Sequence, residues 1–131
     1  AGLCRRKVHN AAGTNDRRHP RNQALLRRQQ GWRISPAHDL VPAPVVSLER
    51  RDLALTVGNY GRTASIYNLL SQAGRFGLSA EAARTEIDQV VAVVRQWRES
   101  FFASGVSAQD VGHIAPAILP ECFFFDTRPD D

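Results

Sequence analysis

The chain has 131 residues, of which 43% are hydrophobic, and this length is enough for one domain with a real core. It contains no apolar run of about 18 residues and no signal-peptide pattern, so we expect a cytoplasmic protein with no membrane segment. The sequence has no Met, even at position 1, and we interpret it as part of a longer reading frame. Cys4 and Cys122 lack metal-ligand spacing, and we expect reduced thiols.

Charge is distributed unevenly along the chain. Residues 1–51 carry eleven Arg or Lys against three acids, whereas residues 52–131 carry six Arg against ten acids. Every base except Lys7 is Arg, which suits bidentate phosphate contacts better than Lys does. A GC-rich genome that favours Arg codons is the simpler explanation, and a surface for nucleotides or nucleic acid is the other.

The first part of the chain predicts a helix followed by a polar loop and a hairpin. Residues 3–12 form the helix, which the Gly-containing turn at 13–15 ends. Residues 14–22 are polar and irregular. Two strands at 23–27 and 32–35 flank a turn with Gly, which predicts a two-stranded hairpin.

A loop and a short strand follow the hairpin. Pro36, Pro42 and Pro44 exclude regular structure over 36–44. Alternating apolar residues predict a strand at 53–57, and two glycines predict a turn at 58–61.

The second half predicts three helices and a loose end. Thr63 or Ser65 begins a helix over about 64–74, which Gly74 and Gly77 end. The strongest helical periodicity covers about 80–103, after Ser79 as cap and before Gly105. Ser107 and Asp110 form a capping box for a helix at about 108–118. We expect a loose tail from Pro120 onward, with Phe123-Phe124-Phe125 as a packing anchor.

Two polar loops carry residues that suit phosphoryl transfer. Such a reaction needs a carboxylate to accept the hydroxyl proton, cations for the phosphates and oxygen ligands for magnesium. Asp16 can supply the carboxylate, and Asn22 and Asp39 can supply the metal ligands. Arg21 can contact a phosphate. A purely structural polar loop is the alternative that the spacing alone leaves open.

The residues around these loops resemble the C-terminal lobe of HipA-family kinases, the serine/threonine kinase toxins of type II toxin–antitoxin systems. The resemblance is clearest in the run His19-Pro20-Arg21-Asn22 and in the run Ser35-Pro36-Ala37-His38-Asp39, and it extends over about residues 5–120. It implies a mainly α fold with a small β-hairpin, arranged as a protein-kinase-like C-terminal lobe. It divides the chain into a catalytic-loop and metal-loop region at 1–44, a helical part at 45–119 and the tail at 120–131.

The resemblance also implies roles for residues. Asn22 and Asp39 match the family's magnesium ligands, and His19 and Arg21 match the His and the Lys or Arg of its catalytic loop. The family motif reads Asp-x-His-x-Lys/Arg-Asn, which places the catalytic Asp two residues before the His. Arg17 occupies that position here, and Asp16 lies one residue too early.

This departure bears directly on activity. A guanidinium cannot accept a proton, and an offset of one residue moves a carboxylate by about 3.8 Å. Either the loop changes register so that Asp16 is the base, or the site is inactive, and we favour the second. The chain also shows no phosphate-covering loop with an ATP-contacting Lys, so we do not expect it to phosphorylate a protein alone.

Three hypotheses follow. The first is a fragment of a HipA-like kinase that uses ATP and Mg²⁺ to phosphorylate a protein serine, with a helix-turn-helix antitoxin as partner and DNA bound indirectly through that complex. The second is a non-catalytic remnant that contacts an antitoxin or nucleic acid through its Arg-rich first half. The third is a decayed gene product. Whether the chain is an enzyme stays open at this point.

Overall fold

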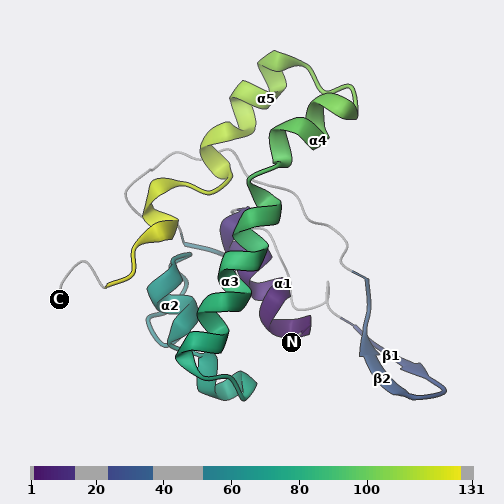
Figure 1. The fold of residues 1–131 in the computed structure, drawn as a ribbon, viewed down its shortest axis with the longest axis vertical. Helices are drawn as coiled ribbons and strands as arrows, with labels where there is room; N and C mark the ends of the chain where they lie inside the picture. Colours follow the sequence, from purple (N-terminus) through teal and green to yellow (C-terminus); the bar gives the residue numbers. More distant parts are fainter. Residues whose placement is uncertain (1, 14–23, 37–51, 128–131) are drawn as a thin grey trace.

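The fold is known from a computed structural model, which describes residues 2–13, 24–36 and 52–127. Figure 1 shows a group of helices with a two-stranded hairpin that projects from one side. The described part is mainly helical, as predicted. None of its helices is both long enough and apolar enough to cross a bilayer.

Helix α1 (Gly2–Ala12) packs along α3 (Ala80–Val94) and supplies one side of the core. Val8, Ala11 and Ala12 are almost fully buried. On the outer side, Arg5 Nε lies 2.5 Å from Glu86 Oε2 on α3. The hydrogen bond from Arg5 lowers the pKa of Glu86, but an exposed pair of this kind contributes little stability. The helix predicted at 3–12 is therefore confirmed.

The predicted hairpin is confirmed, with shifted strand ends. Strand β1 (Leu25–Arg28) pairs antiparallel with β2 (Gly31–Ile34) across a two-residue turn. Gly31 has φ +117°, a conformation that favours glycine. The sheet contains only these two strands among the described residues.

The strand predicted at 53–57 is wrong, whereas the turn at 58–61 is confirmed. The backbone bends after Leu53, and only two isolated bridges form, between Asp52 and Thr63 and between Gly58 and Gly61. Leu53 and Val57 are nevertheless buried. The segment that faces residues 53–57 is the tight turn up to Thr63. It is not an extended strand, so no continuous series of strand–strand hydrogen bonds forms.

The helix predicted at 64–74 is shorter than expected. Helix α2 (Ile66–Leu70) is followed by a turn and by the 3₁₀ helix η2 (Ala73–Phe76). The hydroxyl of Ser71 donates to the carbonyl oxygen of Asn68 at 2.6 Å. Such local side-chain bonds compete with the helical ladder. Ser65 lies at the N-cap position without a capping bond, and Gly77 ends η2 in the left-handed conformation, as predicted.

The single helix predicted at 80–103 is two helices. Ser79 caps α3 as predicted, with its hydroxyl oxygen accepting from Ala82 N, but α3 ends at Val94 and α4 (Trp97–Ala103) follows. At the break, Gln96 N bonds the carbonyl of Val93 instead of that of residue 92. No Pro or Gly lies there, but four β-branched valines precede it at 90, 91, 93 and 94, and such residues weaken helices.

The C-terminal segment is packed, which corrects the expected loose tail. Ser107 caps α5 (Ala108–Ile114) through Asp110 N, as predicted, and the 3₁₀ helices η3 (Ala115–Ala117) and η4 (Glu121–Phe124) follow. Phe123 is fully buried, because its ring fills the space between α1 and α2. The anchor role is thus confirmed for Phe123, whereas Phe124 and Phe125 are exposed. Residues 128–131 lie outside the described part.

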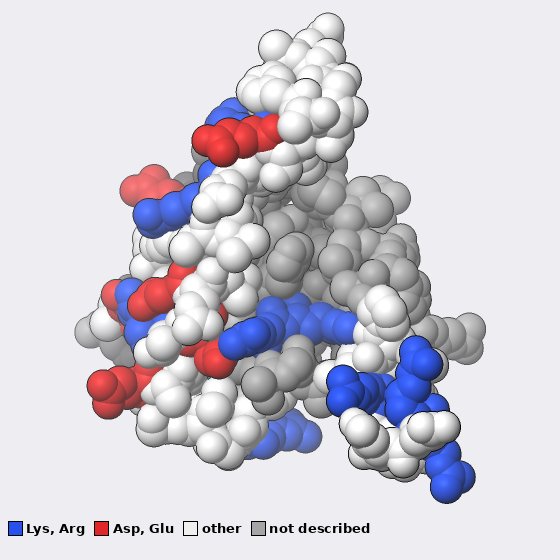
Figure 2. Space-filling view, turned by 45° about the vertical axis from the view of Figure 1, so that its right-hand side comes forward, with Lys and Arg blue, Asp and Glu red and all other residues white. Residues whose placement is uncertain are grey.

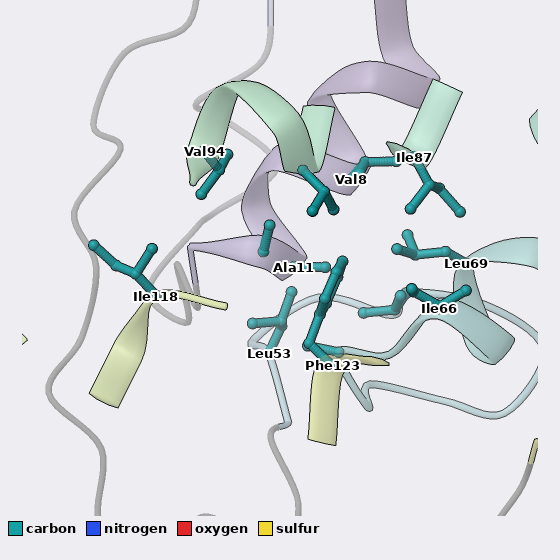
Figure 3. Packing of buried hydrophobic residues seen from close by; sticks show 13 residues of the cluster. Val8, Ala11, Leu53, Ile66, Leu69, Ile87, Val94, Ile118 and Phe123 are labelled. Carbon is teal, nitrogen blue, oxygen red and sulfur yellow. The ribbon is translucent and has the colours of Figure 1, made fainter. Parts of the chain in front are cut away.

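One apolar core joins these elements (Figure 3). The ring of Phe123 extends between Leu53 and Ile66 toward Ala11 of α1. The predicted inward face of α3 is confirmed for Ala83, Ile87, Val91 and Val94. Val90 and Trp97 are only partly buried. Phe102 of α4 is 51% exposed.

We expect Phe123→Ala to destabilise the fold by about 3–5 kcal/mol, because it empties the centre of the core. Phe102→Ala is the matched control and should change the free energy of unfolding by about 0.5 kcal/mol or less. Urea denaturation of both variants measures the difference. Equal effects of the two substitutions would contradict the packed C-terminal segment.

Candidate functional site

The predicted site residues lie outside the described part of the chain. This applies to Asp16, His19, Arg21, Asn22 and Asp39, and also to Arg17. The structure does describe the segments that flank them, which are the end of α1, both strands of the hairpin and the residues from Asp52 onward. The candidate site is therefore built from this framework.

The open end of the hairpin is the first part of the framework. Ser35 N donates to the carbonyl of Ala24 at 2.8 Å. Ala24 N in turn donates a hydrogen bond of 3.3 Å to the hydroxyl oxygen of Ser35. Ser35 is buried although the strands beyond it are exposed. The chain that leads back to Asn22 and the chain that leads on to Asp39 therefore leave the hairpin from the same closed pair.

Arg6 connects this pair to α1. Its Nη2 donates to the carbonyl oxygen of Ser35, and its Nη1 is buried and has no hydrogen-bond partner in the described structure. A charge-assisted bond to a carbonyl contributes about 1.5–3 kcal/mol. Sequence reasoning missed this role, because the run Arg5-Arg6-Lys7 gives no sign of which base turns inward.

Lys7 makes the corresponding contact on the other side of α1. Its Nζ donates to the carbonyl of Val57 at 2.9 Å and lies 5.6 Å from the centre of the Phe76 ring. The cation–π contact adds to this bond. Neighbouring bases of one helix thus fix two separate loops to the core.

The loop beside Val57 is ordered by one buried amide. Asn68 is fully buried, and its Nδ2 donates to the carbonyls of Gly61 and Thr63 at 3.1 and 2.8 Å. Its Oδ1 accepts from Tyr60 N at 3.0 Å. A Cβ on Gly58 would lie 1.9 Å from the Asn68 carbonyl oxygen, so only glycine fits there. We assign this network a structural role rather than a catalytic one, because its polar groups are hydrogen-bonded to one another.

Of the four histidine side chains, the structure describes that of His113 alone. No group of three or more His, Cys, Asp or Glu residues is placed to bind a metal within 2–13, 24–36 and 52–127. His113 is exposed near the end of α5. His19 and His38 lie outside the described residues.

Replacing Arg6 by Met should loosen the hairpin base without unfolding the core, because Met keeps the length of the side chain and removes its donors. We expect amide exchange at Ser35 to accelerate about 10- to 100-fold, which corresponds to the loss of about 1.5–3 kcal/mol. Arg5→Met is the control, since Arg5 pairs with Glu86 on the exposed side. Hydrogen–deuterium exchange compares them, and equal acceleration in both would refute the connection.

Comparison with known proteins agrees with the framework. The sequence model of the family described as HipA-like C-terminal domain matches residues 1–97. Searches of curated proteins and of solved structures gave no match. The matched residues include α1, both predicted site loops, the hairpin and α3, and they reach the first residue of α4. The chain therefore belongs to the HipA-like C-terminal domain family.

Proposed function

We propose that this chain is the metal-binding part of a HipA-like serine/threonine protein kinase. The intact protein would transfer the γ-phosphoryl group of ATP to a serine of a protein substrate. The observation that carries the proposal is the closed base of the hairpin at Ala24 and Ser35. Asn22 precedes this pair by two residues and Asp39 follows it by four, so the two predicted ligands are tied to one anchored point.

The donor atoms of these two residues suit magnesium. An amide oxygen from Asn22 and a carboxylate from Asp39 are the hard oxygen ligands that Mg²⁺ binds together with water and substrate phosphates. When bound, the ion would neutralise negative charge on the ATP phosphates. Arg21 would contact a phosphate or orient a neighbouring carboxylate, and His19 would take the place of the family's catalytic-loop His.

The order of elements supports a protein-kinase-like C-terminal lobe. A helix leads into the catalytic loop, a hairpin separates the two loops, and helices follow. Lys7 binds the Val57 carbonyl, so it is not the Lys that contacts ATP. We expect that Lys and the phosphate-covering loop from another part of the protein. We also propose that the protein is cytoplasmic and that its partner is a helix-turn-helix antitoxin. DNA would be bound indirectly, through the complex with that antitoxin.

A second candidate function is a non-catalytic pseudokinase. It is favoured by Arg17, which stands at the position of the family's catalytic Asp and cannot act as a base. In that case the protein would bind magnesium and nucleotide without transferring phosphate. The two candidates differ in whether the natural protein transfers phosphate, so its own rate, measured beside those of Arg17 variants, separates them.

Deleting Arg17 from the intact protein leaves Asp16-Arg18-His19, which restores the spacing of the family motif. We expect phosphotransfer from radiolabelled ATP to rise about 100-fold or more, because a catalytic group misplaced by about 1 Å already costs that much. Arg17→Asp, which puts a carboxylate two residues before His19, should also raise the rate. Arg17→Ala keeps the misplaced register and should not.

The metal ligands are tested in the same assay. Asp39→Asn in the Arg17-deleted protein should abolish the gain, whereas Glu121→Gln, at an exposed acid of η4, should leave it unchanged. If neither Arg17 variant gains activity while Mg²⁺-dependent ATP binding persists, the pseudokinase is correct. Absence of both activity and Mg²⁺-dependent binding would refute the kinase assignment for this site.

A further inference from the structure

The hairpin presents two chemically different faces. In the register of β1 and β2, Leu25 lies opposite Ile34, Leu26 opposite Arg33, Arg27 opposite Trp32 and Arg28 opposite Gly31. Residues directly opposite one another share a face. One face therefore carries Trp32, Arg27 and two aliphatic side chains, and the other carries Arg28, Arg33 and Leu26.

Large apolar side chains on this hairpin are exposed to an unusual degree. Trp32 is 67% exposed and Leu25 is 62% exposed. A two-stranded hairpin is marginally stable in isolation, and this one is attached to the body of the protein at its base by Arg6 and Ser35. We call this anchored hairpin, residues 24–36, the ribbon. An exposed aromatic side chain on such a ribbon is typical of a binding surface.

The same ribbon is strongly basic. Residues 24–36 carry three Arg, at 27, 28 and 33, and no acid. The polar side chains at the tip of the ribbon line one shallow, open surface, and they are Arg27, Arg28, Gln29, Gln30 and Arg33. Figure 2 shows basic side chains gathered on the hairpin, and no described acidic side chain lies beside them in that view. By contrast, Glu86 and Asp88 of α3 form ion pairs with Arg5 and Arg84.

We propose that this ribbon binds single-stranded nucleic acid. Trp32 offers a stacking surface for a base, and Arg27 on the same face offers a phosphate contact. Arg28 and Arg33 on the other face offer further phosphate contacts to a strand that passes around the narrow hairpin. The amides of Gln29 and Gln30 at the tip can bond base edges. Proteins bind single strands without strict sequence preference by combining cationic side chains with an exposed aromatic side chain on which a base stacks.

The chemistry favours a single strand over other anionic partners. A duplex stacks its bases on one another and offers Trp32 no base face, whereas an unpaired strand does. An acidic protein surface would satisfy the three Arg but would not use the aromatic face in the same way. This proposal does not depend on phosphoryl transfer, because none of the ribbon residues belongs to the predicted kinase site.

Fluorescence anisotropy of the intact protein with a labelled strand of roughly 12 nucleotides tests the proposal, since binding folds of this kind cover about 4–16 nucleotides. The logarithm of the affinity should fall with the logarithm of the KCl concentration with a slope of about −2, as three phosphate contacts predict for a single strand. Arg27→Gln with Arg33→Gln should reduce that slope by about 1.4.

The stacking contact has its own test. Trp32→Ala should weaken binding roughly 5- to 150-fold with little change of the salt slope. All these side chains are exposed, so urea denaturation should show unchanged folding. The matched controls are Arg62→Gln with Arg75→Gln, at exposed arginines outside the ribbon, and Phe102→Ala, at an exposed aromatic of α4. They should leave binding unchanged.

Four results would overturn the proposal. The first is a loss of affinity in the controls as large as in the ribbon variants. The second is equal or tighter binding of a duplex of the same length. The third is full displacement of the strand by inorganic phosphate at equal phosphate concentration, which would indicate a site for small anions. The fourth is protection of Trp32 from iodide quenching in the intact protein, which would show that another part of it covers the ribbon.

Discussion

The hydrogen bond between Arg6 and the carbonyl of Ser35 is the contact on which the position of the candidate site depends. The hairpin has no other strand beside it in the described chain and buries almost none of its residues. Its orientation therefore comes from its base. Because Ser35 is bonded to Ala24 as well, one guanidinium positions both backbone segments that lead to the predicted metal ligands.

The position of the Arg6 guanidinium depends on the position of helix α1, to which Arg6 belongs. The inner face of α1 packs on α3. The C-terminal end of α1 contacts the segment around Leu119 and Phe123. Leu119 N donates to the carbonyl of Ala12 at 2.7 Å, and Phe123 fills the core beside Ala11. The ion pair of Arg84 with Asp126 at 2.8 Å adds a peripheral contact. Residues near the C-terminus thus stabilise the helix that orients the hairpin.

Local signals in the sequence predicted the beginnings of elements better than their lengths. Ser79, Ser107 and Gly77 act through their immediate neighbours, so their roles could be foreseen from residue type and spacing. The early end of α2 depends on a competing side-chain bond from Ser71, and the break after Val94 follows four β-branched valines. Periodicity registers neither effect. The packed tail depends on contacts between residues more than a hundred positions apart, such as Leu119 with Ala12.

The same distinction applies to the candidate site. Residue types in the two loops suggested magnesium ligands at Asn22 and Asp39 only together with the resemblance to the family, whose model matches the region that contains them. The sequence could not reveal that Arg6, rather than Arg5, turns toward Ser35, because both lie on one helix and only the folded arrangement of the hairpin distinguishes them. The basic and aromatic ribbon was visible only as a general excess of Arg.

The central claim is that a divalent ion binds next to the anchored base of the hairpin, and paramagnetic relaxation tests it most directly. Mn²⁺ titrated into the intact, isotopically labelled protein with ATP should broaden the amide signals of Ala24 and Ser35 first. The amides of α5 should stay sharp, and excess Mg²⁺ should reverse the effect. Broadening confined to another part of the protein, with Ala24 and Ser35 unaffected, would contradict the claim.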